Sequence, residues 1–244
     1  GRQRRSTTIS TMDPLTALIL GGSFLAKEAV GDAAKRILGP SWDVVGARVR
    51  NRLFGSHVGP VVGEAAELLL EARHEPQPVP AQILMQLLEH ASHEEDETLH
   101  QKWVALLANA ASPTAANKIL PSYVDTLRQI TPKQAEMLDW MHKQSQPPVW
   151  ADGGRRWPDF KRDDLEQRFG LSPADYALLF TDLERLGLIE PRRPLHRLGS
   201  QDVETQVAII SEWINDRVQY AEISFTALGI RFVEACEPPA PMSP

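Results

Sequence analysis

The chain has 244 residues, of which 42% are hydrophobic and 24% charged, and its formal net charge is −6. This composition is ordinary for a globular protein of one or two domains, and it excludes collagen-like, disulfide-framework and wholly disordered chains. The negative net charge disfavours binding of nucleic acid by electrostatic attraction to the whole protein. The only cysteine, Cys236, allows no disulfide within the chain, which fits a cytoplasmic location.

The N-terminal part is expected to consist of a leader, residues 1–12, and helices over residues 13–75. Glycine and proline break these helices, as at Gly39-Pro40. The segment is rich in small residues and mildly basic, which allows close helix packing and favours anionic membrane surfaces. We take it as a candidate for self-association or, on activation, for membrane contact. The candidate residues are Lys35, Arg36, Arg48 and Arg52.

Residues 76–146 carry the strongest helical pattern and are predicted to form a helical core. Prolines at 76, 78 and 80 predict an extended connector before the first helix. Ser92 with Glu95 has the spacing of a capping box, which predicts that the helix carrying Trp103 begins there. A second capping box is predicted at Thr131 and Gln134.

Residues 147–157 are expected to be a linker, residues 158–237 a small α+β domain, and the Pro-rich residues 238–244 a disordered tail. The elements predicted for the α+β domain are a helix that closes at Gly170, a helix between Ser172 and Gly187, a short strand over 188–191, a hairpin over 207–225 and a helix over 226–235. This order is that of a winged helix. The predicted fold class is therefore mainly α, a helical bundle followed by a small winged-helix-like domain.

A winged helix suggests DNA binding, which needs basic or amide side chains that reach a groove. The predicted recognition helix, residues 173–186, contributes a single basic residue, and residues 151–244 hold 16 acidic against 11 basic side chains. We therefore favour a protein-interaction module and keep a DNA-binding regulator as the alternative. The candidate nucleic-acid-binding residues are Arg185, Arg192, Arg193 and Arg197.

Two further patterns concern catalysis and metal binding. Arg52 and His57 have the Arg-x4-His spacing that resembles the catalytic motif of HEPN ribonucleases, so an RNA-cleaving toxin is a less favoured alternative. A second set shares helical spacing but is interrupted by the expected helix start at Ser92, so we expect no metal and no cofactor. That set is His90, His93, Glu97 and His100.

The stretch Val79-Pro80-Ala81-Gln82-Ile83-Leu84, the acidic segment around Glu94 and the run Trp103-Val104-Ala105-Leu106-Leu107-Ala108-Asn109-Ala110 resemble the Abi-alpha (abortive infection alpha) family. The resemblance is close over residues 79–132 and loose over residues 25–237. It implies bacterial defence against phage, in which infected cells die or stop growing, and it supplies no catalytic residues. We therefore expect a non-enzymatic defence protein that acts through a protein partner, self-association or membrane contact.

Overall fold

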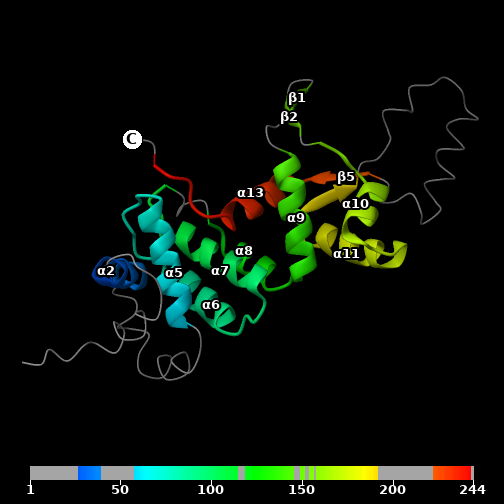
Figure 1. The fold of residues 1–244 in the computed structure, drawn as a ribbon. Coiled ribbons are helices and arrows are strands. Elements are labelled where there is room, and N and C mark those ends of the chain that lie inside the picture. Colours follow the sequence, from blue (N-terminus) through cyan, green and yellow to red (C-terminus); the bar gives the residue numbers. More distant parts are fainter. Residues whose placement is uncertain are drawn as a thin grey trace, which may run out of the picture. The chain divides into compact units, whose positions relative to one another are not determined.

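The computed structural model describes residues 27–39, 58–114, 119–145, 149–151, 154–156, 158–191 and 222–242. These residues are mainly helical and include a small three-stranded antiparallel sheet, which confirms the predicted mainly-α class. The chain divides into two compact units (Figure 1). Unit 1 comprises Gly1–Val124 and Cys236–Pro244, and unit 2 comprises Asp125–Ala235.

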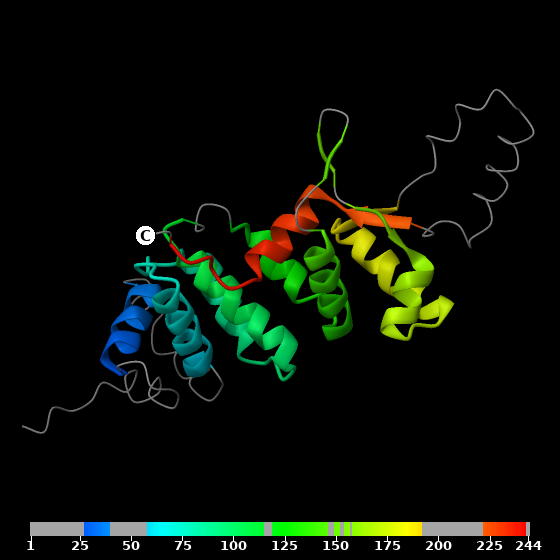
Figure 2. The same cartoon turned by 45° about the horizontal axis from the view of Figure 1, so that its top comes forward.

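Unit 1 is built from helices. They are α2 (Lys27–Leu38), α5 (Val58–Glu71), α6 (Ala81–Ala91), α7 (Glu97–Ala110) and α8 (Pro121–Leu127), the last of which continues into unit 2. Helix α5 packs against α2, α6 and α7, and Figure 2 shows it, in cyan, beside the blue α2. No helix of the described residues is long and apolar enough to cross a lipid bilayer.

The predicted extended connector links α5 to α6 and is held by backbone hydrogen bonds. The Val79 N–H donates to the Ile37 carbonyl at 3.1 Å, and the Gln77 N–H donates to the Ala111 carbonyl at 2.8 Å. Helix α2 ends at Leu38, and Gly39 follows it, as predicted, with φ of 56°. Glycine is required there because a Cβ would lie 2.8 Å from Pro78 Cβ.

Unit 2 combines four complete helices with short strands among its described residues. They are α9 (Pro132–Gln144), β1 (Val149–Ala151), β2 (Gly154–Arg156), β3 (Phe160–Lys161), α10 (Arg162–Phe169), α11 (Pro173–Arg185), β4 (Ile189–Pro191), β5 (Glu222–Phe225) and α13 (Ala227–Ala235). Strands β1 and β2 pair with each other, and the second sheet has the order β3-β5-β4. In that sheet Phe160 is paired with Ile223, and Ile189 with Phe225.

Local signals set most helix ends of unit 2. The predicted capping box of α9 is present, because Thr131 Oγ1 accepts from the Gln134 N–H and Gln134 Oε1 accepts from the Thr131 N–H. Helix α10 closes on Gly170 in the left-handed conformation, and Ser172 caps α11 as predicted. Gly187 follows α11 with φ of 71°. The core contains Tyr176, Phe180, Leu183, Ile223, Phe225 and Phe232.

The capping box predicted at Ser92 and Glu95 is wrong. Ser92 still belongs to the end of α6, since its hydroxyl donates to the Glu89 carbonyl at 2.9 Å. Helix α7 starts at Glu97, and the side chain of Asp96 accepts from the Leu99 N–H at 3.1 Å. The start therefore lies four residues later than predicted, because Asp96 is the residue placed to reach the third helical N–H.

Two other segments differ from their expected character. Within the predicted linker, strands β1 and β2 form an antiparallel pair, in which Val149 is opposite Arg156. Residues 238–242 of the predicted disordered tail lie along unit 1 and are hydrogen-bonded to it. Of the predicted hairpin over 207–225, residues 222–225 form β5. The remainder of that hairpin and the predicted leader lie outside the described residues.

Candidate functional site

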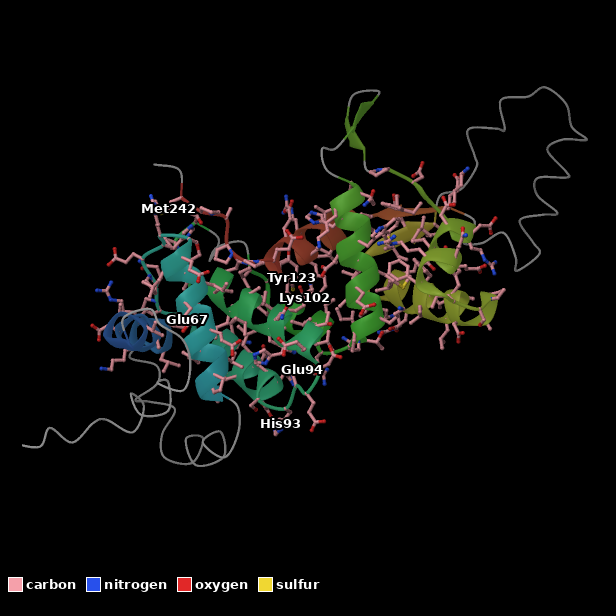
Figure 3. The ribbon with its side chains drawn as sticks, in the orientation of Figure 1. Glu67, His93, Glu94, Lys102, Tyr123 and Met242 are labelled. Atoms are coloured by element: carbon pink, nitrogen blue, oxygen red, sulfur yellow. The ribbon has the colours of Figure 1, made fainter. Side chains whose placement is uncertain are left out.

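Helix α7 is the buried centre of unit 1. Every residue from Lys102 to Ser112, which follows the helix end, is buried. A helix that is surrounded by protein must place any polar side chain against a partner, because an unpaired buried polar group costs free energy. The face that carries Asn109 and, one turn later, Ser112 is therefore the part of α7 where polar contacts are specified. Lys102, which is labelled in Figure 3, lies seven residues before Asn109 and therefore on the same side of α7 by helical spacing.

The polar groups at the C-terminal end of α7 hold the residues that follow Cys236. Asn109 Nδ2 donates to the Glu237 carbonyl at 2.7 Å. His74 Nε2 lies 2.9 Å from the Ala240 carbonyl, and His74 Nδ1 lies 2.7 Å from Ser112 Oγ. A carbonyl oxygen can only accept, so His74 Nε2 carries a proton and donates it to Ala240. This buried chain of contacts fixes the ring of His74.

The end of α5 provides a third contact for the same segment. The Arg73 N–H bonds to the Leu70 carbonyl and the His74 N–H to the Leu69 carbonyl, which is the Schellman pattern. Arg73 adopts φ of 59° in the position that glycine usually takes. The Ala72 carbonyl accepts from the Met242 N–H at 3.0 Å. Helix α5 thus ends in a strained turn that directs both His74 and a terminal carbonyl at the tail.

The corner between α6 and α7 contains a second group of titratable residues. Trp103 is 1% exposed, and its indole Nε1 lies 3.4 Å from Glu94 Oε2. The ring of His90 packs 5.9 Å from that of Trp103, whereas His93 is exposed. Figure 3 shows His93 and Glu94 at one end of unit 1 and Met242 at the other. The corner therefore positions Trp103 as part of the core.

The histidines at helical spacing do not form one cluster. His100 Nε2 lies 2.9 Å from Glu64 Oε2 on α5, while His90 contacts Trp103. Among the described residues, no group of three or more His, Cys, Asp or Glu side chains could hold a metal ion. Since α6 and α7 are separate helices, the sequence spacing does not translate into one face.

The basic candidates on α2 are engaged in ion pairs at the surface. Lys35 lies 3.9 Å from Asp32, and Arg36 pairs with Glu75. All four side chains are at least half exposed, so these pairs contribute little to stability. The remaining N-terminal candidates, Arg48, Arg52 and His57, lie outside the described residues.

Helix α11 presents Arg185 together with acidic and amide partners. Its guanidinium contacts Asp182 Oδ1 at 2.7 Å and Gln129 Oε1 at 3.2 Å. Partial burial raises the pKa of Asp182, but hydrogen bonds from Arg185 and Gln134 outweigh it and hold that pKa below its usual value. The guanidinium of Arg185 would have to give up these contacts to bind a phosphate group. The other basic candidates, Arg192, Arg193 and Arg197, lie outside the described residues.

The exposed side of α11 carries Leu178 among small, polar and charged residues, including Asp175 and Arg185. Leu178 is 72% exposed, and Ala174, Ala177 and Thr181 are exposed near it at helical spacing. The opposite side of α11 is buried in the core of unit 2 through Tyr176, Phe180 and Leu183. Helix α11 thus has apolar residues on both sides, and the described residues bury only the side of Tyr176, Phe180 and Leu183.

Comparison with protein families identifies a relationship. The model of the abortive infection alpha family matches residues 61–236. The chain belongs to this family. The match spans most of the chain, contains α6 and α7, and confirms the resemblance found in the sequence. Family membership indicates abortive-infection-type defence. Comparisons with curated proteins and with solved structures find no match.

Sequence reasoning did not select the residues that the structure brings together. His74 follows a helix end and has no nearby pattern, and its partners are 38 and 166 residues away. Asn109 carried a signal, since it is the one amide in an otherwise apolar run of α7. Leu178 could have been found by tracing helical periodicity from Tyr176, because it falls opposite the buried face.

Proposed function

We propose that this abortive infection alpha protein is a non-enzymatic component of phage defence that acts by binding a protein partner through α11. The observation that carries the proposal is the exposure of Leu178, at 72%, with the small residues Ala174 and Ala177 exposed near it. A helix that presents a large apolar side chain can place it in an apolar groove of another protein. Burial of Leu178 against a partner would contribute about 1.5–3 kcal/mol to binding.

We further propose that unit 2 from α9 to α13 is a winged-helix-like module. Support comes from the order α9, β3, α10, α11, β4, β5, α13 and from the antiparallel sheet order β3-β5-β4. In DNA-binding proteins of the helix-turn-helix class, the second helix of the pair contacts base edges. Helix α11 has that place, but its exposed face carries Leu178 and the acidic Asp175, and its basic residue, Arg185, is hydrogen-bonded to Asp182. The charge pattern therefore favours a protein over DNA.

The test is phage challenge of bacteria that express the full chain with Leu178→Glu. We expect loss of the growth arrest or cell death that limits phage yield, because a carboxylate would have to be desolvated at the interface. The matched control is Leu120→Glu, since Leu120 is also exposed, at 44%, but lies in unit 1. Both variants should unfold at the wild-type temperature. Full protection by Leu178→Glu at wild-type expression would exclude α11 as the contact surface.

The DNA-binding alternative is tested on the same protein. Labelled duplex DNA is titrated with the wild type at low and high salt, and fluorescence anisotropy is measured. Binding to phosphates would fall steeply as salt rises, and would weaken when Arg192, Arg193 and Arg197 are changed to alanine. We expect no such salt-dependent binding. If it is found, and if Leu178→Glu retains protection, unit 2 is a DNA-binding regulator.

A further inference from the structure

We propose that unit 1 contains a binding site for an extended Pro-rich segment and that residues 237–242 of the same chain are its resident ligand. Three hydrogen bonds join this segment to the rest of unit 1. They involve the Glu237 carbonyl, the Ala240 carbonyl and the Met242 N–H. Each of these hydrogen bonds uses a backbone atom of the segment, so these contacts recognise its conformation.

The spacing of the contacts fits a polyproline II conformation. The two accepting carbonyls, of Glu237 and Ala240, are three residues apart, and a polyproline II helix has three residues per turn. Prolines occupy positions 238, 239 and 241, and each restricts φ to the value this conformation needs. Pro239 is buried. The segment therefore presents two carbonyls on one side and buries a proline ring between them.

The receiving side consists of buried polar groups oriented by other contacts. His74 is 4% exposed and Asn109 is 6% exposed, and the ring of His74 is held by Ser112, which is fully buried. The left-handed turn at Arg73 sets the position of His74 and of the Ala72 carbonyl. Preorganised, buried donors of this kind are typical of a recognition site, since their exposure or loss of partner costs free energy.

Occupation of the site has a consequence for the connection between the units. The chain enters unit 2 within α8 and returns to unit 1 at Cys236, directly before the bound segment. When the segment is bound, unit 2 is anchored to unit 1 at both of its ends. When it is released, only the α8 connection remains. The segment thus acts as a latch, and Cys236, 3% exposed and the only cysteine, reports its state.

The first experiment measures the rate at which Cys236 of the full chain reacts with a thiol reagent. Loss of one hydrogen bond of the site in Asn109→Ala should raise this rate about fivefold, because the segment is released more often. The control is His93→Ala, which changes an exposed histidine away from the segment. Equal rates in wild type and Asn109→Ala would overturn the latch. A rate that falls as protein concentration rises would show that the segment comes from a second copy.

The second experiment tests whether the site binds its ligand as a separate molecule. In the full-length variant Pro239→Gly/Pro241→Gly, the binding of the resident segment to the site is weakened, because glycine increases the entropy of the released chain. The residues of the site itself are unchanged. A labelled peptide with the sequence of residues 237–244 should bind this variant and should bind wild type at least tenfold more weakly, since the tethered segment competes. A peptide with both glycine changes is the control. Absence of binding to the variant would overturn the site.

Discussion

Helices α7 and α11 have similar lengths and opposite surroundings. Both begin with a side-chain cap, from Asp96 and Ser172 respectively. Helix α7 is buried from Lys102 onwards and includes the polar Asn109 in its buried part. Helix α11 is buried on one side and exposes Leu178 on the other. One helix therefore buries polar groups, and the other leaves a large apolar group in water.

This difference identifies where each unit is specialised. Buried apolar and exposed polar residues need no explanation beyond folding, whereas a buried polar group or an exposed apolar surface is informative. In unit 1, the buried polar groups meet backbone atoms of the chain's own tail. In unit 2, no residue described in the structure is placed over Leu178, which keeps it 72% exposed. The buried polar groups of unit 1 thus find their partners within the chain, whereas the exposed Leu178 of unit 2 is suited to contact with another protein.

The same substitution made on both helices is the most direct test of the comparison. Leu106→Ala on α7 should lower the free energy of unfolding by about 2–5 kcal/mol, because Leu106 is fully buried and its loss leaves a cavity. Leu178→Ala on α11 should change that free energy by less than about 0.5 kcal/mol. Urea denaturation of both variants measures the two values. Similar losses would show that Leu178 is covered in solution.

A substitution at the strained end of α5 is expected to raise the free energy of unfolding. Arg73 is exposed and has φ of 59°, which costs an L-residue about 1 kcal/mol relative to glycine. Arg73→Gly should therefore raise the free energy of unfolding by up to about 1 kcal/mol while it leaves the direction of His74 unchanged. Thermal denaturation together with the reactivity of Cys236 checks both statements. A destabilised variant would mean that the arginine side chain itself supports the turn.

The smallest expected effect concerns the charges on α11. The folded pKa of Asp182 is lowered, so its contribution to stability is fully present above its usual pKa and is lost as the pH falls through the folded value. The difference in unfolding free energy between wild type and Asp182→Asn should be present at neutral pH and should disappear in acid. Denaturation at a series of pH values measures it. A difference that persists in strong acid would show that Asp182 acts through packing.

Sequence signals were sufficient where a helix end is encoded by adjacent residues. Thr131 with Gln134, and the glycines at 170 and 187, define the ends of their helices locally. The start of α7 was misplaced because two overlapping cap patterns, at Ser92 and Asp96, compete within five residues. The pair β1–β2 also had a signal, since Asp152-Gly153 between the strands is typical of two-residue hairpin turns.

The tail contacts lay beyond what local patterns can indicate. A proline-rich segment has the composition of a disordered chain, and it becomes ordered here because partners far along the sequence satisfy its backbone. Asn109 and Glu237 are 128 residues apart, and His74 and Ala240 are 166 apart. Such pairs depend on the packing of α5 and α7, which the periodicity of either helix alone does not determine.

The return of the chain to unit 1 also sets an order of events during protein synthesis. All of Asp125–Ala235 must be translated before Glu237 exists, so unit 1 waits for its last segment for roughly 5–20 s at ordinary rates of elongation. Until then, His74 and Asn109 lack their carbonyl partners. A nascent chain interrupted within unit 2 would keep this surface open to chaperones and proteases. Binding of residues 237–242 to unit 1 therefore occurs only after the whole of unit 2 has been synthesised.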